Sequence, residues 1–274
     1  IYLMVPEKDE FFERMFLELS EDICFLYVDQ SKISSMLLSS GLRHISAATF
    51  YRFLIPELLG KEYQTCLYLD SDIVVTGDIS KLLLLPLGDH ILMGVKNYFD
   101  QEHDPVFIRE RSADCGIPDL NTYINAGVLL INIEELGKLA PAMIEDLRQN
   151  SYPFNDQDVL NKHCYGRIGL LPSRYNFITY QLRLSMGEEI EAVFRSEADH
   201  ILIAHYAAPK KPWVYKGSLM ADLWEEAMRQ CPHAVRKELL APYVREKRRE
   251  LPFRDRIEDR LKYLFRRFVL RSFR

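Results

Sequence analysis

With 274 residues, the chain is long enough for one large domain, or for one domain followed by a tail. Hydrophobic residues make up 48% and charged residues 27%, which is typical of a globular protein and excludes a disordered or fibrous one. The net charge of −5 conceals an asymmetry, because residues 243–274 carry +7 and the remainder carries −12. This distribution argues against nucleic acid as the main ligand and favours contact between the basic end and an anionic surface.

The cysteines are odd in number and widely scattered, and none forms a Cys-X-X-Cys pair. This spacing predicts neither a zinc site nor a disulfide framework, and favours reduced thiols in a cytosolic protein. The five are Cys24, Cys66, Cys115, Cys164 and Cys231. No apolar run approaches the roughly 18 residues that a membrane-spanning helix needs.

The first part of the chain reads as alternating strands and helices. Residues 1–5 predict a buried strand, residues 8–20 a helix and residues 23–28 a second strand, which together form a β-α-β unit. A short helix and loop are expected at 31–42. A helix at 47–59 should then end at Gly60, acting as a glycine just beyond the helix terminus.

An apolar run at 66–69 predicts a central strand, and two carboxylates, Asp70 and Asp72, interrupt the run directly after it. In extended chain the side chains at i and i+2 point the same way, so both can converge on one divalent cation. Without a cation, two such charges are costly to bury. A solvated turn or a helix cap is the alternative interpretation of the pair.

The middle of the chain continues the pattern, with strands expected at 91–95, 123–132 and 201–206. Helices are expected at 133–149 and from residue 155 onward. The polar segment 97–122 predicts an irregular, mobile lid. Polar residues mark the ends of several of these elements, and the carboxyl edge of one α/β sheet is where ligands bind. We therefore expect Asn125, Asp156, Gln157, His205 and Lys211 to join the two aspartates at that edge.

Each of these residues also has a purely structural interpretation. Asn125 could satisfy a backbone group at the end of its strand, and Asp156 could cap its helix. His205 could be a hydrogen-bonded residue at a strand end, and Lys211 could be solvated.

The end of the chain differs from the rest. Aromatic and aliphatic residues recur at three- and four-residue steps between residues 253 and 268, opposite a face of Arg and Lys. A basic amphipathic helix of this kind is typical of an interfacial membrane anchor. Packing on the body or on a partner protein is the alternative. The domain boundaries that follow are 1–240 for the body and 241–274 for the basic tail.

Six motifs, in this order, resemble the retaining glycosyltransferases of family 8, and in particular the bacterial lipopolysaccharide galactosyl- and glucosyltransferases. They are RHIS (43–46), LYLDSDIVV (67–75), YINAGVLLIN (123–132), DQDVLN (156–161), RYNF (174–177) and HYAAPKKPW (205–213). The resemblance implies an α/β fold of the GT-A type, which is a Rossmann-like, mostly parallel mixed sheet that binds a nucleotide-sugar.

The resemblance implies that Asp70, Asp72 and His205 coordinate a divalent metal that bridges the two phosphates of the donor. Carboxylates with one imidazole suit Mn²⁺, with Mg²⁺ as the alternative. The metal would act as a Lewis acid on the departing nucleoside diphosphate, and Lys211 would add a second positive charge.

Residues elsewhere in the motifs are expected to handle the sugar. The resemblance implies that Arg52, Asn125, Asp156 and Gln157 hold the hydroxyls of the transferred sugar, and that His44 lies near donor and acceptor. Gln157 and Asp156 are the candidate catalytic residues. Because an amide is a poor nucleophile, retention of configuration favours a front-face reaction over a double displacement.

Two departures from the family pattern stand out. The chain starts at what corresponds to the family's second strand, so we expect an N-terminally truncated fold without the first β-α unit and its contacts to uracil and ribose. A glycine that approaches the phosphates in relatives is replaced by Ala208.

The expected function is transfer of glucose or galactose from UDP-glucose or UDP-galactose to a glycan or lipid-linked glycan, such as the lipopolysaccharide core. The protein would be cytoplasmic and peripheral on the inner face of the cell membrane. An inactive or truncated family member and a metal-dependent nucleotidyltransferase are the alternatives. The latter should carry further carboxylates and a glycine-rich phosphate loop, neither of which is clear.

Overall fold

The computed structural model describes residues 1–37, 47–99, 104–183, 196, 200–207, 209–238 and 249–250. The chain forms two compact units that alternate along the sequence. Unit 1 comprises Ile1–Tyr68, Ser80–Asn97 and Pro105–Leu171, and unit 2 comprises Leu69–Ile79, Tyr98–Asp104 and Pro172–Arg274. The predicted residues His44 and Ala208, and nearly all of the predicted tail at 241–274, lie outside the described residues.

Unit 1 begins with the predicted β-α-β unit. Strands β1 (Tyr2–Val5) and β2 (Cys24–Tyr27) pair in parallel, and α1 (Glu10–Leu17) connects them. Asp9 caps α1, because its side chain accepts a hydrogen bond from the backbone N–H of Phe12. The predicted burial of the first strand is wrong, since Tyr2 is exposed and the other three residues of β1 are only partly buried.

The next segment is helical, as predicted, but its first half has the tighter geometry. After α2 (Gln30–Leu37), the 3₁₀ helix η1 (Ala47–Leu54) leads into the short α3 (Ile55–Leu59), which has a proline in its first turn. Gly60 ends α3 with a right-handed φ of −65°, so the predicted left-handed glycine cap is absent there. A Cβ at Gly60 would instead lie 2.4 Å from the carbonyl oxygen of Pro56.

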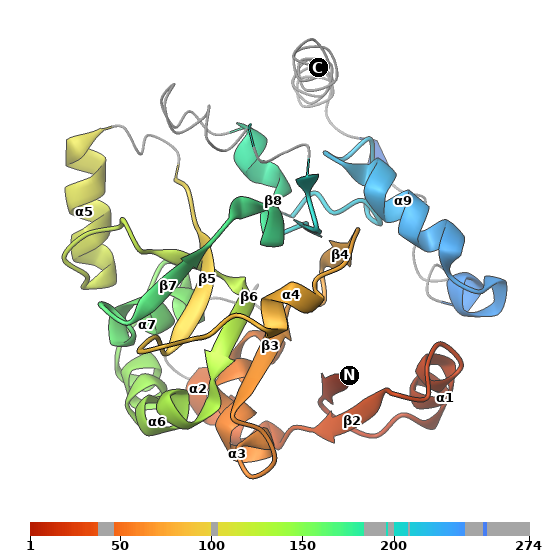
Figure 1. Cartoon of the computed structure of the whole chain (residues 1–274), viewed down its shortest axis with the longest axis horizontal. Coiled ribbons are helices and arrows are strands. Elements are labelled where there is room, and N and C mark those ends of the chain that lie inside the picture. Colours follow the sequence, from red (N-terminus) through yellow and green to blue (C-terminus); the bar gives the residue numbers. More distant parts are fainter. Residues whose placement is uncertain are drawn as a thin grey trace. The chain divides into compact units, whose positions relative to one another are not determined.

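The main sheet of unit 1 has the order β3-β6-β5-β7 (Figure 1). Its strands are β3 (Thr65–Leu69), β5 (Leu92–Lys96), β6 (Ile124–Asn132) and β7 (Ile168–Leu171). Strand β5 runs antiparallel to β6 and parallel to β7, which confirms a mixed sheet. The prediction that the strand before the two aspartates is central is wrong for the described sheet, because β3 is at its edge.

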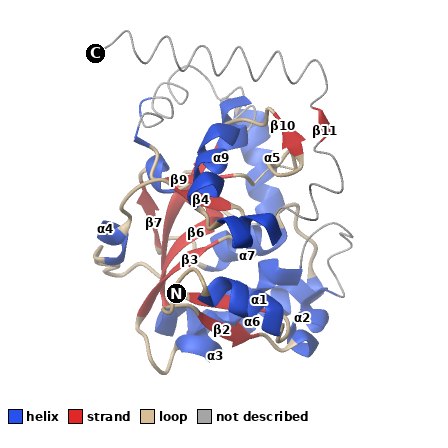
Figure 2. Ribbon diagram, turned by 90° about the vertical axis from the view of Figure 1, so that its right-hand side faces the viewer, coloured by secondary structure: helices blue, strands red, loops and turns tan. Residues whose placement is uncertain are grey.

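The core of unit 1 lies between this sheet and the helices that follow β6. Figure 2 shows α6 (Ile133–Gln149) and α7 (Asn155–His163) along one face of the strands. Alternate residues of β6, including Leu129 and Ile131, join Leu136 and Met143 of α6 in one buried cluster. The side chain of Asn132 caps α6 by accepting from the backbone N–H of Glu135, at 3.1 Å.

The predicted irregular conformation of 97–122 is wrong in part, because α5 (Pro105–Cys115) occupies part of this segment, whereas its role as a mobile lid stays a prediction. The buried residues of α5 are Arg111, Ser112 and Cys115, two of which are polar. A helix whose buried side is polar gives no hydrophobic periodicity, so the sequence pattern did not reveal it. The described part of unit 1 also contains α4 (Ser80–Leu83), a single helical turn.

Unit 2 is built on a second sheet, with the order β4-β9-β8. Its strands are β4 (Ile73–Val75), β8 (Phe177–Ile178) and β9 (Ile203–His205), where β9 is antiparallel to β4 and parallel to β8. A small aromatic cluster packs against this sheet and α9 (Ala221–Gln230). The described residues of unit 2 also form η2 (Ser173–Tyr175), η3 (Thr179–Arg183), β10 (Tyr215–Lys216) and β11 (Arg249–Glu250).

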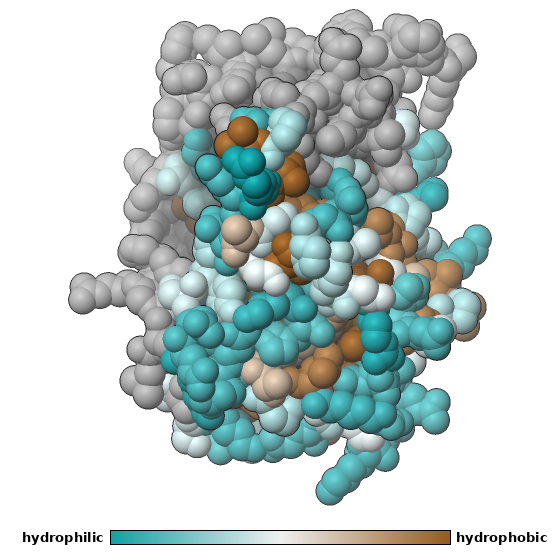
Figure 3. All heavy atoms as spheres, turned by 90° about the vertical axis from the view of Figure 1, so that its left-hand side faces the viewer, coloured by the Kyte–Doolittle hydropathy of each residue, from teal (hydrophilic) through white to brown (hydrophobic). Residues whose placement is uncertain are grey.

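Hydrophilic residues cover most of the described surface on the face drawn in Figure 3, with hydrophobic residues in separate patches between them. Among the described residues, no helix is both long enough and apolar enough to span a lipid bilayer. All five cysteines are free thiols, as predicted.

Candidate functional site

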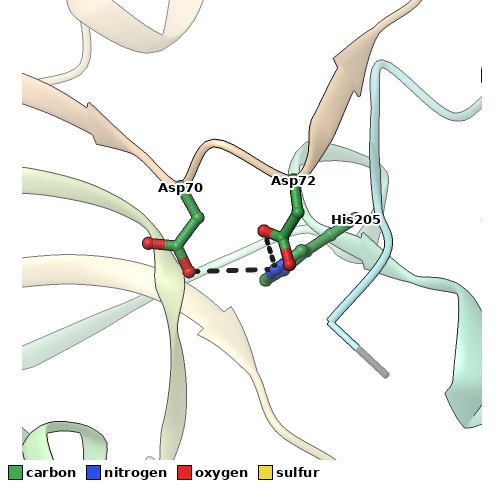
Figure 4. Close-up of side chains that lie close together, drawn as sticks. All are labelled: Asp70, Asp72 and His205. Atoms are coloured by element: carbon green, nitrogen blue, oxygen red, sulfur yellow. Dashed lines mark ion pairs between the residues drawn. The ribbon is translucent and has the colours of Figure 1, made fainter. Parts of the chain in front are cut away.

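Unit 2 brings together the three residues that were predicted as metal ligands. One ligand atom from each of Asp70, Asp72 and His205 lies within 4.8 Å of the other two. Nε2 of His205 is 3.1 Å from Oδ1 of Asp72 and 3.8 Å from Oδ2 of Asp70 (Figure 4). The imidazole is buried, at 2% exposure, whereas about a fifth to a quarter of each carboxylate side chain is exposed.

The backbone explains why residues so far apart in sequence meet here. Asp70 directly follows β3, and a two-residue turn leads from it to Ile73, the first residue of β4. Ile73 lies opposite His205 in the antiparallel pair of β4 and β9. The pairing continues for one more bond, because the backbone N–H of Tyr206 donates to the carbonyl of Asp72 at 2.9 Å. The short sheet of unit 2 therefore positions the histidine beside the aspartates.

A neighbouring amide orients the histidine. Nδ1 of His205 is 2.9 Å from Oδ1 of Asn176, which is fully buried between η2 and β8. Because an amide oxygen only accepts, this bond assigns the proton of neutral His205 to Nδ1. Nε2 is therefore the nitrogen that faces the two carboxylates: when protonated it donates to Asp72, and without that proton it offers the lone pair that a metal ligand needs.

A lysine completes this group. Nζ of Lys211 forms an ion pair with Oδ2 of Asp72 and also donates to the carbonyl of Tyr206. Burial by itself would raise the pKa of Asp72, but its hydrogen bond to His205 and the charges of His205 and Lys211 lower that pKa to about 2. Asp72 is therefore ionised at neutral pH.

The residues fit a divalent cation. Ligand atoms about 2.1 Å from an ion such as Mg²⁺ are separated by about 3 to 4 Å from one another, close to the spacing of these three groups. Two carboxylates and one imidazole also match the ligand preferences of Mn²⁺ and Mg²⁺ better than those of zinc in a structural site.

Unit 1 brings together the residues that were predicted to hold the sugar. Arg52 and Asp156 form a buried ion pair, with Nη1 of Arg52 3.2 Å from Oδ2 of Asp156. Thr49 donates to the other oxygen of Asp156 at 2.8 Å, and Arg52 donates to the carbonyl of Ala126 at 2.6 Å. Asp156 does not cap α7. Phe154 is at the cap position, and Asp156 lies in the first turn of the helix. The carboxylate of Asp158 accepts a hydrogen bond from the backbone N–H of Phe154 instead.

Gln157 and Asn125 contact each other in the same unit. Oε1 of Gln157 accepts from Nδ2 of Asn125 at 3.0 Å and from the backbone N–H of Ala126 at 3.1 Å. Oδ1 of Asn125 accepts from the backbone N–H of Gly127 at 2.9 Å. Both amides are thus held in defined orientations at the start of β6 and the first turn of α7.

The predicted site residues that the structure describes fall into one group in unit 2, formed by Asp70, Asp72, His205 and Lys211, and another in unit 1, formed by Arg52, Asn125, Asp156 and Gln157. The expectation of one sheet is wrong, because β3 and β6 belong to the first sheet whereas β4 and β9 form the second. Sequence reasoning assigned no role to Asn176 or Asp158, although both lie inside quoted motifs. Thr49 carried no signal in the sequence.

Comparison with known proteins agrees with these motifs. A model of the family described as Glycosyl transferase family 8 matches residues 4–217. The chain belongs to this family. Because this match begins at residue 4, it gives no support to the expectation that the first β-α unit is absent.

Two curated relatives act on lipopolysaccharide according to their names. Lipopolysaccharide 1,2-glucosyltransferase of Escherichia coli (strain K12) is 31% identical over 173 residues, which cover 61% of this chain and 49% of that protein. Lipopolysaccharide 1,3-galactosyltransferase of Salmonella typhimurium is 26% identical over 217 residues, which cover 76% of this chain and 60% of that protein. The chain thus matches about half to three-fifths of the length of these relatives.

A solved structure, that of the WbbM bifunctional glycosyltransferase in its apo form, has a TM-score of 0.69 with this chain. The similarity covers 84% of this chain and 44% of that one, at 22% sequence identity. It confirms the predicted α/β fold of the GT-A type for this family 8 chain.

Proposed function

We propose that this family 8 chain is a metal-dependent, retaining glycosyltransferase. It would transfer glucose or galactose from a UDP-sugar to a glycan or lipid-linked glycan, such as the lipopolysaccharide core. The observation that carries the proposal is the group of Asp70, Asp72 and His205, which supplies three ligands suited to a divalent cation in unit 2. The names of the curated relatives support the classes of donor and acceptor.

In this proposal Asp70, Asp72 and His205 hold Mn²⁺, with Mg²⁺ as the alternative. When bound, the metal would supply Lewis-acid stabilisation to the departing diphosphate. Lys211, which pairs with Asp72 in the structure, would provide a second positive charge for the phosphates. His205 would remain oriented by Asn176 throughout.

Arg52, Asn125, Asp156 and Gln157 would bind the hydroxyls of the transferred sugar, and His44 would lie near donor and acceptor. The ion pair of Arg52 and Asp156 favours a binding role for both, because each side chain is held in place by the other. The amides of Asn125 and Gln157 offer donors and acceptors in fixed directions, which suits the recognition of sugar hydroxyls.

The contacts of Gln157 favour a front-face reaction. Its Oε1 already accepts two hydrogen bonds, so both lone-pair directions of the oxygen are occupied and a nucleophilic attack by it is disfavoured. In a front-face reaction the leaving phosphate helps to deprotonate the acceptor hydroxyl. Trapping a covalent sugar adduct on the wild-type protein, together with only trace activity of Gln157→Ala, would contradict this mechanism.

The test of the proposed function is Mn²⁺-dependent release of UDP from UDP-glucose and UDP-galactose. Asp72→Asn should lower turnover by about 100-fold or more, because it removes a charged ligand of the cation. Asp114→Asn, at an exposed carboxylate on α5, is the control and should leave turnover unchanged. Equal turnover by Asp72→Asn and wild type would refute the metal assignment. Pyrophosphate release from a nucleoside triphosphate would favour a nucleotidyltransferase.

We also propose that the basic residues at 241–274 bring the protein to the inner face of the cell membrane. The +7 charge at 243–274 and the spacing of its aromatic residues support this role. Full-length protein should sediment with vesicles that contain anionic lipid, and should stay in solution with purely zwitterionic vesicles. Equal sedimentation with both kinds of vesicle would contradict an electrostatic anchor.

A further inference from the structure

Gln157 is hydrogen-bonded to a set of buried polar side chains that have no role in the reaction proposed above. Tyr123 precedes β6, Arg111 is on α5 and Asp158 is on α7. Their exposures are 1%, 7% and 0%, so none of them contacts solvent appreciably. All three belong to unit 1, as Gln157 and Asn125 do. Buried polar groups at this density need a structural or functional reason.

The directions of the hydrogen bonds in this set follow from one fixed donor. The backbone N–H of Ala126 can only donate, so the atom of Gln157 that faces it must be Oε1. Nε2 of Gln157 therefore faces the hydroxyl of Tyr123 at 3.2 Å and donates to it. The hydroxyl has a single proton, which it donates to Oδ1 of Asp158.

Asp158, at the other end of this series of hydrogen bonds, forms an ion pair with Arg111. Nη2 of Arg111 lies 2.5 Å from Oδ1 of Asp158, and its guanidinium carbon lies 4.7 Å from the centre of the Phe154 ring. The backbone N–H of Phe154 donates to Oδ2 of Asp158 at 2.8 Å. Burial and the adjacent Asp158 raise the pKa of Tyr123 well above its ordinary value, so the hydroxyl keeps the proton that it donates.

We propose that Tyr123 and Asp158, held by Arg111, are positioning residues that fix the orientation of the Gln157 amide. The inference rests on the proposed function, in which Gln157 and Asn125 bind the transferred sugar. If the Gln157 amide turned over, its NH₂ group would face the N–H of Ala126 and the NH₂ of Asn125, which are both donors. Loss of the set should therefore impair recognition of the sugar and leave diphosphate binding in unit 2 unchanged.

The first test observes the amide directly and needs no substrate. Tyr123→Phe should shift the side-chain ¹⁵N–¹H signals of Gln157 and Asn125, assigned with Gln157→Ala and Asn125→Ala. Tyr152→Phe is the matched control, because Tyr152 is also buried in unit 1 and donates to a carboxylate, that of Asp146, at 2.7 Å. The control should leave both amide signals in place. Unchanged Gln157 signals in Tyr123→Phe would overturn the proposal.

The second test separates positioning from stability. In the presence of Mn²⁺, Tyr123→Phe should weaken binding of UDP-glucose or UDP-galactose by about tenfold and leave UDP binding unchanged, as expected for one lost orienting hydrogen bond. In a Gln157→Ala background the same substitution should have no further effect. An undiminished effect in that background would overturn the proposal. If wild type bound neither UDP-sugar, the proposed function would fail, while the amide signals would still decide the role of Tyr123.

Discussion

At the scale of single residues, the bond between Asn176 and His205 decides which imidazole nitrogen faces the aspartates. His205 alone could present either nitrogen, and only the one without a proton can bind a cation. The buried amide of Asn176 fixes the proton on Nδ1 of His205 without any bound ligand. The same principle operates at Gln157, where Ala126 and Tyr123 decide which amide atom faces which neighbour.

Replacing this amide should therefore weaken metal binding without touching a ligand. Asn176→Leu should lower the affinity for Mn²⁺ by about 10- to 100-fold, because Nδ1 loses its acceptor. Asn176→Asp keeps an acceptor at the same place and should bind Mn²⁺ about as well as wild type. Titration of the free Mn²⁺ signal by electron paramagnetic resonance measures both. Equal weakening in the two variants would point to misfolding of η2 rather than to loss of orientation.

At the scale of elements, Asn161 fixes α7 against the start of β6. Its side chain accepts from the backbone N–H of Ile124 at 2.7 Å and donates to the carbonyl of the same residue at 2.9 Å. It thus gives the first residue of β6 two side-chain hydrogen bonds from α7. Because Gln157 lies one helical turn before Asn161, this contact also determines where Gln157 meets Asn125.

Asn161→Leu should lower the free energy of unfolding by about 2 to 4 kcal/mol, since it removes two hydrogen bonds to the backbone of Ile124 and one to the carbonyl of Gln157. Asn150→Leu is the matched control. Asn150 is exposed and its amide donates to Asp146 at 2.7 Å, so its loss should cost about 1 kcal/mol or less. Urea unfolding followed by circular dichroism measures the difference. If Asn161→Leu lowered the free energy of unfolding no more than the control does, water would have replaced the hydrogen bonds of Asn161.

At the scale of the whole molecule, buried thiols make the free energy of unfolding depend on pH. Burial raises the pKa of Cys164 to about 12, against an ordinary value near 9. The folded protein thus keeps this thiol neutral while the unfolded chain ionises it. The contribution of the neutral Cys164 thiol to the free energy of unfolding is fully present below pH 9 and is lost progressively as the pH rises toward 12.

Above pH 9, ionisation of this thiol in the unfolded chain should lower the free energy of unfolding by about 1.4 kcal/mol for each pH unit. Cys164→Ala should show a correspondingly shallower decline with pH, although it is less stable at neutral pH because of the cavity. Cys24→Ala should keep the wild-type slope, because that thiol is exposed in the folded protein. Unfolding curves at several pH values between 8 and 11 measure the slopes. Identical slopes for wild type and Cys164→Ala would contradict a neutral buried thiol.

The sequence by itself determined the family motifs, the elements with strong hydrophobic periodicity and the identity of the candidate ligands. Helix α6 and strand β6 agree with the prediction because their apolar patterns are long and regular. Helix α5 was missed because its buried side carries Arg111 and Ser112. Pairing between distant strands leaves no local pattern, so the edge position of β3 and the second sheet were not predictable. Only the tertiary structure decided that the antiparallel pair of β4 and β9 brings His205 to Asp72, and that Asn176 turns its ring toward the carboxylates.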